Sequence, residues 1–428
     1  MKIPNRIPGV KFRSASETMT SFAGLRFVFA LAAKLGVISD LRNLTVKKRD
    51  RGIPIDDFVM SLAANFLVGG DCLSDLSVLR GERVTRELCF GLEVPAPTTA
   101  GERLRTFSLG HIAQLGGVVR RADRAILERM GDSRPATIDV DSSIFEVYGY
   151  QKQGAFHGYT GVRGLHPLLA FVAEERLLLG ARLRAGNRAS ADGVVSFLTE
   201  ALQAVPPRRR IRLRMDAGFY SRTVEGFCVA RKLEFSLSAV LTGRLKAAIG
   251  ALPAGAWQSY PWEEDAEWAE MRYQPCGWSR EYRLLVKRTP WFEGDQRVVD
   301  EHFLVAVLTN LRGAGSSVIR HHLARGGAEN YIEEFKNGIG AAHLPSKSFH
   351  ANWAWLLIAA LAYNLAQAFK LLLLTAKRRA DQIKKLRLHW FNLAARWIRT
   401  GRQRILALAR GPDVANAFAE LQERLAAL

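Results

Sequence analysis

The segment between about residues 135 and 240 most constrains the fold, because strand-like and helix-like stretches alternate along it. Its first stretch, TIDVDSSI, places Asp139 and Asp141 on one face of a strand and apolar side chains on the other. Two carboxylates on one side of a buried strand are costly unless they are paired with cations or bind a metal. Either pairing or metal binding is therefore expected at this strand.

The rest of the segment predicts a mixed α/β sheet. The stretches HPLLAFVA and LLLGARLRAGN read as a hairpin turning at Glu174 to Arg176, and a helix is expected from Ala191 to Val205. The stretch RRRIRLRMDAG then predicts a strand with Asp216 at its C-terminal end. A helix and the strand EFSLSAVL follow. The predicted order is three strands, helix, strand, helix, strand, and strand ends in such sheets often carry the chemistry.

A second cluster of charged side chains is expected on one helix, IRHHLARGGAENYIEEFK. At 100° per residue, His322, Arg325, Glu329 and Lys336 fall on one face, with Glu333 beside them. Arg325, four residues before Glu329, favours its ionised form. The alternative is a solvated helix face held by ion pairs.

The flanking regions are predicted from composition and hydrophobic pattern alone. Residues 1–130 read as helical, either as a helix-turn-helix DNA-binding module or as a structural cap. Residues 241–300 alternate like strands, and the apolar run from Trp353 to Leu374 reads as a buried core helix rather than a membrane span. Residues 376–428 read as a basic helical region, whose basic side chains either contact DNA phosphates or form a solvated surface. Its candidate DNA-binding residues are Arg378, Arg379, Lys384, Lys385, Arg396 and Arg399.

The charge of the chain indicates its partner. A formal net charge of +20 over 428 residues favours a polyanion, and we expect nucleic acid rather than an acidic membrane. The four cysteines are scattered without a CxxC pair, so no structural zinc site or disulfide framework is predicted. Reduced thiols fit a cytoplasmic protein.

Three carboxylates, Asp141, Asp216 and Glu329, make the set expected of a ribonuclease-H-like site with two Mg²⁺ ions about 4 Å apart. With Arg325 and Lys336, the last acid resembles the Tyr-x2-Arg-x3-Glu-x6-Lys signature of DDE transposases of bacterial insertion sequences, with His322 in place of the tyrosine. TIDVDSS and RMDAGFYS are similar to the family's motifs at the first and second acids.

This resemblance covers about residues 135–375 and makes Asp141 the first acid, with Asp139 as the reserve. It implies a ribonuclease-H-like core split between residues 131–240 and 301–375. The interval from Asp216 to Glu329, 329 − 216 = 113 residues, resembles the family's β-rich insertion, here 241–300.

The activity implied by the resemblance is cutting of element ends and joining of 3′-hydroxyls to target DNA. Mg²⁺ is the expected cofactor, with Mn²⁺ as a substitute. His322, Arg325 and Lys336 are expected to contact DNA. A homodimer on double-stranded DNA, located in the cytoplasm with the nucleoid, is implied by analogy. The alternatives are a nuclease or recombinase of the same fold and a catalytically inactive DNA-binding protein.

Overall fold

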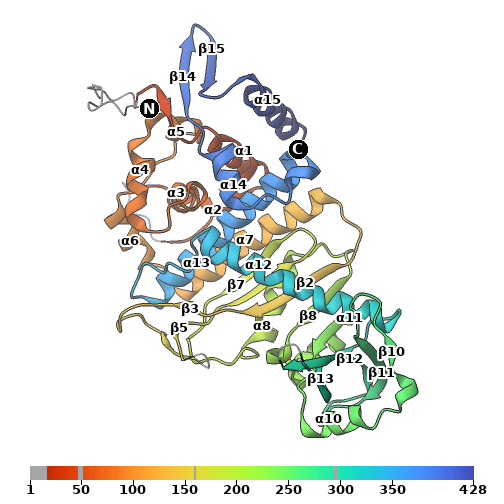
Figure 1. The fold of residues 1–428 in the computed structure, drawn as a ribbon. Coiled ribbons are helices and arrows are strands. Elements are labelled where there is room, and N and C mark those ends of the chain that lie inside the picture. The colour runs from red at the N-terminus through yellow and green to blue at the C-terminus, as the bar shows by residue number, and fades with distance from the viewer. Residues whose placement is uncertain (1–16, 47–51, 159–160, 294–295) are drawn as a thin grey trace, which may run out of the picture.

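A computed structural model describes residues 17–46, 52–158, 161–293 and 296–428 (Figure 1). Its centre is a nine-stranded sheet with the order β10-β11-β12-β13-β9-β8-β2-β6-β7. The strands are β2 (Ala136–Ser142), β6 (Leu168–Val172), β7 (Leu177–Arg182), β8 (Ile211–Met215), β9 (Glu234–Ser238), β10 (Gln258–Ser259), β11 (Glu267–Tyr273), β12 (Tyr282–Glu293) and β13 (Gln296–Thr309).

The sheet is mixed. β2, β8 and β9 run parallel, whereas β6 and β7 form an antiparallel hairpin on the other side of β2. Helices α8 (Val194–Ala201) and α9 (Arg222–Ala230) connect the strands in the predicted order. The predicted fold class, a mixed sheet flanked by helices, is confirmed, and the hairpin turning after Val172 is confirmed with it.

The predicted β-rich insertion does contain strands, but these extend the central sheet. β13 pairs with β12 over most of its length and with β9 at its end, both antiparallel. Helix α10 (Gly243–Gly250) precedes these strands. A small separate sheet with the order β3-β5-β4 lies between β2 and β6 in the chain; its strands are β3 (Phe145–Glu146), β4 (Phe156–His157) and β5 (Arg163–Leu165).

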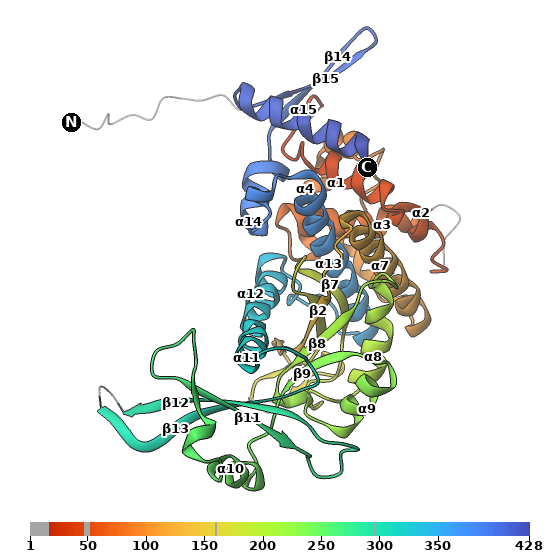
Figure 2. The same ribbon diagram turned by 90° about the vertical axis from the view of Figure 1, so that its right-hand side faces the viewer.

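A continuous run of helical turns follows β13. It consists of α11 (Gly315–Leu323), a 3₁₀ turn (Ala324–Gly326), α12 (Gly327–Glu333) and a π turn (Glu334–Gly338). Figure 2 shows α11 and α12 on one side of the central strands and α8 and α9 on the other. We call the segment from Gly315 to Gly338 the crossing helix.

The apolar stretch near residue 360 forms α13 (Phe349–Ala368) and a π turn (Phe369–Leu373). Among the described residues, Phe349–Leu373 is the unbroken helix long and apolar enough to cross a membrane, yet 89% of its most apolar 18-residue stretch is buried inside the protein. Its polar Asn364 is fully bonded: the amide donates to Asp123 and to the Leu178 carbonyl and accepts from the Leu178 N–H. The predicted core helix is confirmed.

Residues 17–46 and 52–130, the described part of the N-terminal region, are mainly helical, as predicted; residues 1–16 and 47–51 of that prediction lie outside the described residues. Its elements are β1 (Met19–Thr20), α1 (Leu25–Lys34), α2 (Val37–Arg42), α3 (Ile55–Val68), a 3₁₀ turn (Leu73–Asp75), α4 (Leu76–Gly81), α5 (Arg83–Leu88), α6 (Pro97–Leu104) and α7 (Leu109–Met130). Both α3 and α7 pack against α13. These helices and the central sheet therefore share one hydrophobic core.

The C-terminal region is only partly helical, which corrects the prediction. It contains short turns at Ala376–Arg378 and Arg387–Phe391, α14 (Ile383–Leu386), β14 (Ala395–Thr400), β15 (Gln403–Leu408) and α15 (Pro412–Ala427). β14 and β15 form the projecting hairpin of Figure 1, which β1 joins along β14. The hairpin turns tightly between Thr400 and Gln403, where Gly401 has a positive φ of 52° that suits a two-residue turn.

Candidate active site

Asp141 and Asp216 come from neighbouring parallel strands. β2 and β8 pair with Val140 opposite Met215, so the next position on each strand is Asp141 and Asp216. Neighbouring strands lie about 4.8 Å apart. The fold therefore brings together two acids that are far apart in the chain, as the sequence predicted.

Asp141 is held at both carboxylate oxygens. Its Oδ1 accepts from the Ser142 N–H at 2.7 Å, and its Oδ2 accepts from Arg325 Nη1 at 3.2 Å. The side chain is 18% exposed. Burial raises the pKa of Asp141, and the nearby charge of Asp216 raises it further, while Arg325 opposes both. A cation bound at Asp141 would therefore relieve its repulsion with Asp216.

Asp139 has a different environment, although it lies on the same face of β2. Its two oxygens accept from Arg214 Nε at 2.6 Å and Nη2 at 2.7 Å. Both side chains are almost fully buried, at 1% and 5% exposure. Burial raises the pKa of Asp139, and the guanidinium of Arg214 opposes the rise. Both oxygens of Asp139 are therefore engaged by a buried cation, which favours Asp141 over the reserve Asp139 as the first acid.

The crossing helix is tied to successive strands of the sheet. Arg214 on β8 donates to the His321 carbonyl at 2.5 Å, and Arg325 reaches Asp141 on β2. Further along, the ring of Tyr331 packs 6.0 Å from that of Phe171 on β6. The helix thus passes over β8, β2 and β6 in their order in the sheet.

His322 fastens the start of the crossing helix to the sheet rather than contacting DNA. It is 2% exposed, and its two ring nitrogens hydrogen-bond the hydroxyls of Ser236 and Ser238 on β9 at 3.0 and 2.9 Å. Burial and neighbouring arginines lower the pKa of His322 to about 3. The ring is neutral and inaccessible, which contradicts the predicted DNA contact.

Glu329 lies on the exposed side of the crossing helix, one turn after Arg325 and before Tyr331. Those two residues contact β2 and β6, so Glu329 lies on the stretch of helix that passes over Asp141. The predicted ion pair between Arg325 and Glu329 is replaced by the pair between Arg325 and Asp141. Lys336 donates to the Ile144 carbonyl at 3.1 Å, just beyond the end of β2.

These residues fit a divalent cation by their chemistry. Asp141 and Asp216 stand side by side, both partly accessible, and carboxylate oxygens are the ligands that Mg²⁺ prefers. Repulsion between them is the feature that a cation would remove. Within the described part of the chain, Asp141, Asp216 and Glu329 do not together place one carboxylate oxygen each within 4.8 Å of one another.

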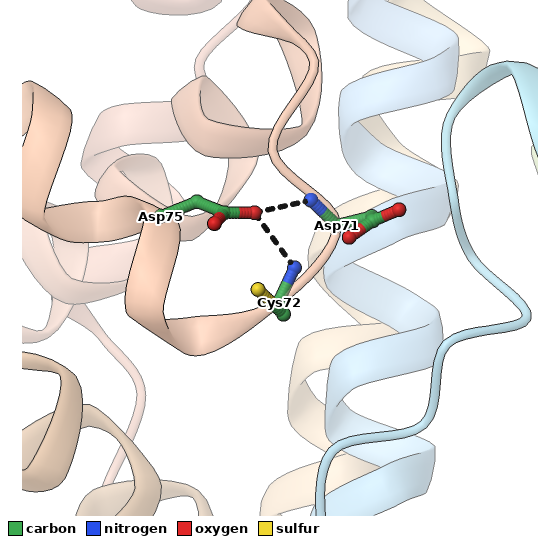
Figure 3. Close-up of side chains that lie close together, drawn as sticks. All are labelled: Asp71, Cys72 and Asp75. Carbon is green, nitrogen blue, oxygen red and sulfur yellow. Dashed lines mark hydrogen bonds between the residues drawn. The ribbon is translucent and has the colours of Figure 1, made fainter.

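One group of potential ligands does meet that distance within the described part of the chain, namely Asp71, Cys72 and Asp75 (Figure 3). Asp75 accepts from the backbone N–H groups of Asp71 and Cys72 at 3.0 and 3.2 Å. In Figure 3 the carboxylate of Asp71 points away from that of Asp75, and it pairs with His343 at 2.7 Å. This arrangement caps a 3₁₀ turn and does not resemble a metal cage.

The candidate DNA-binding residues of the C-terminal region are all exposed: Arg378, Arg379, Lys384, Lys385, Arg396 and Arg399. α14, which carries two of them, is attached to the crossing helix, because the Ile383 N–H donates to Glu334 at 2.7 Å. Arg396 and Arg399 lie on β14, where Arg399 also pairs with Glu87. The six residues thus do not form one continuous element.

Arg214 is a site residue that was not among the predicted ones. It lies on β8 two residues before Asp216, and it connects Asp139 to the crossing helix. The available signal was the alternation of Arg212 and Arg214 with apolar residues in a strand that had to be buried. An arginine inside such a strand calls for a buried carboxylate partner.

Comparisons with known proteins bear on the family. The family model described as Transposase DDE domain group 1 matches residues 5–428. The comparison with curated proteins found no match. A similar solved structure is titled "Cryo-EM structure of piggyBac transposase synaptic complex with hairpin DNA (SNHP)"; it is 11% identical, with 87% of this chain and 79% of that chain covered and a TM-score of 0.46. Because the family model spans nearly the whole chain, this protein belongs to the Transposase DDE domain group 1 family and is a DDE transposase.

Proposed function

We propose that Asp141, Asp216 and Glu329 are the three catalytic acids of this transposase and that they hold two Mg²⁺ ions. The observation that carries this proposal is the adjacent placement of Asp141 on β2 and Asp216 directly after β8, with the helix that bears Glu329 bonded to Asp141 through Arg325. When bound, such ions activate a hydroxyl nucleophile and stabilise the leaving oxygen of an in-line displacement.

The reaction that we propose has two steps. Water attacks a phosphodiester at the element end, the bond between phosphorus and the 3′-oxygen breaks, and a 3′-hydroxyl is released. That hydroxyl then attacks a phosphodiester of the target DNA and displaces a second 3′-hydroxyl. Arg325 and Lys336, at either end of the stretch that carries Glu329, are suited to orient the phosphate.

Double-stranded DNA is the proposed substrate. The net charge of +20 and the exposed basic residues on α14 and β14 support it. Because α14 is bonded to the crossing helix, Lys384 and Lys385 can follow the backbone of a duplex whose scissile phosphate lies at Asp141. We also propose a homodimer that pairs two ends, acting in the cytoplasm on the nucleoid.

The test uses purified protein, Mg²⁺ or Mn²⁺, and a plasmid carrying the DNA that flanks the coding sequence. The expected result is metal-dependent cleavage followed by joined products, with neither formed by Glu329→Gln although it still binds DNA. Cleavage without joining would indicate a nuclease of the same fold. Binding without cleavage by the unmodified protein would indicate an inactive DNA-binding protein.

The phosphate contacts have their own test. Lys384→Ala with Lys385→Ala should weaken binding about equally for all sequences and reduce the slope of log affinity against log salt by roughly 2. Lys232→Ala, an exposed lysine just after α9, is the matched control. An unchanged slope of log affinity against log salt would show that α14 does not contact the DNA backbone.

A further inference from the structure

The turn after β3 exposes two tyrosines beside the candidate active site. Tyr148 is 83% exposed and Tyr150 is 90% exposed, whereas large aromatic side chains are usually at least partly covered. The turn belongs to the small sheet, whose β3 follows β2 after a gap of two residues. Figure 1 shows β3 and β5 at the edge of the molecule.

A hollow of about 520 Å³ adjoins this turn, and Tyr148 lines it whereas Tyr150 lies outside it. Its lining includes Ser142, the residue directly after Asp141, and also Tyr148, Lys336 and Asn337. A strand rises about 3.3 Å per residue, so Asp141 and Ile144 are at most about 10 Å apart along the chain. One strand of a DNA duplex advances about 3.4 Å per nucleotide. The hollow is therefore within about three nucleotides of a phosphate held at Asp141.

The turn is held by several contacts although its rings are exposed. Arg163 donates to the carbonyls of Gly149 and Tyr150, and its guanidinium lies 5.5 Å from the centre of the Tyr150 ring. The segment that follows is bound to the chain before α13: the Gln153 N–H donates to the Lys347 carbonyl at 2.9 Å. An aromatic group fixed in this way loses little entropy when it binds a partner.

The chemistry of the hollow favours a nucleotide. Lys336 Nζ supplies a positive charge, and Asn337 lies beside it. One carboxylate, Glu146, also lines the hollow, so we assign the phosphate to the Lys336 side and the base to Tyr148. Tyr150, exposed on the same turn, is assigned to a neighbouring base. A base offers its flat face only when it is unpaired, because stacking hides that face inside a duplex. Aromatic rings bind such faces regardless of sequence.

We propose that the hollow lined by Tyr148, together with Tyr150 two residues further along the same turn, binds unpaired nucleotides next to the scissile phosphate. This inference rests on the proposed function, since it takes DNA as the substrate of the same site. It adds a preference for locally single-stranded DNA over a closed duplex.

The test compares a blunt duplex with the same duplex carrying a short single-stranded extension, each with a fluorescent label. Full-length protein with Glu329→Gln is used so that no DNA is cut. We expect tighter binding of the extended duplex. The double variant Tyr148→Ala with Tyr150→Ala should reduce that preference by about 5- to 150-fold per stacked base.

Two controls separate stacking from folding. Tyr148→Phe with Tyr150→Phe keeps the rings and should keep the preference. Phe90→Ala removes another exposed aromatic, 63% exposed after α5, and should have no effect. A fluorescent base analogue in the extension should be quenched by the parent protein and by the phenylalanine variant, but not by the alanine variant.

An equal affinity of the parent protein for both duplexes would overturn the inference, as would an alanine variant that keeps the preference. A lower assembly state of the alanine variant with an unchanged preference would show that the tyrosines bind a protein instead. These outcomes are independent of the proposed function, which fails only if the unmodified protein shows no metal-dependent cleavage.

Discussion

The two acids of β2 should respond in opposite ways to removal. Asp139→Ala would leave Arg214 buried at 5% exposure without its carboxylate, and it would loosen the anchor between β8 and the crossing helix. Asp141→Ala on the same face removes an acid that is 18% exposed and is repelled by Asp216. The pair of variants therefore separates a structural acid from a catalytic one.

The magnitude follows from the burial of the pair. Breaking a buried ion pair by removing one partner costs roughly 3–5 kcal/mol. With an unfolding entropy of about 2.1 cal/mol/K per residue, a cooperative unit of 428 residues loses roughly 3–6 °C in Tm. Asp141→Ala should change the free energy of unfolding by less than about 1 kcal/mol, since its loss also removes repulsion.

The assay is thermal and urea unfolding of both variants beside the unmodified protein, with DNA cleavage measured well below the Tm. Asp139→Ala should be clearly less stable yet keep measurable cleavage, and Asp141→Ala should be stable and inactive. The reasoning is refuted if Asp139→Ala has the stability of the unmodified protein and no cleavage, because Asp139 would then be the metal-binding acid.

Three further results are expected. Asp141→Ala, Asp216→Ala and Glu329→Ala should each abolish cleavage of plasmid DNA while DNA affinity, measured by fluorescence anisotropy, stays within about threefold. Arg325→Ala should reduce cleavage less than Glu329→Ala does. It should also strengthen Mn²⁺ binding to the DNA-free protein, measured by electron paramagnetic resonance titration, because a cation beside Asp141 is removed. Weaker Mn²⁺ binding would contradict this. For His322, the pKa of about 3 in the folded protein lies below the ordinary value near 6.5, so the unfolded state binds the proton first. The free energy of unfolding should therefore fall as the pH drops from about 6.5 toward 3, by up to about 1.4 kcal/mol per pH unit. His322→Asn should flatten this part of the pH profile measured by urea unfolding, and an unchanged profile would show that the ring is not buried as a neutral group.

The sequence could predict the placement of Asp141 and Asp216, because alternation and strand order together bring the ends of β2 and β8 to one edge. It could not separate Asp139 from Asp141, since residues two apart on a strand share a face. Only Arg214 on the next strand distinguishes them, and that partner depends on the register of the two strands.

The error at His322 has a geometric cause. A helical wheel places it on the face of Arg325 but does not show what that face contacts. The face packs onto the sheet, and successive positions of the crossing helix lie over successive strands. His322 therefore lies against Ser236 and Ser238 on β9, whereas Arg325 lies over Asp141 on β2.

The hairpin of β14 and β15 was missed because its stretch, ARWIRTGRQRILAL, mixes apolar and basic residues without a clear period. Pairing with β1, at the opposite end of the chain, fixes it as a strand. Long-range pairing of this kind is not visible in local pattern.

The most direct test of the three-acid site is a crystal structure with bound Mn²⁺, located by its anomalous scattering. We expect ions ligated by Asp141 and Asp216, with Glu329 completing the site. Ions held by Asp139, or found only at Asp71 and Asp75 with Glu329 turned to solvent, would contradict it.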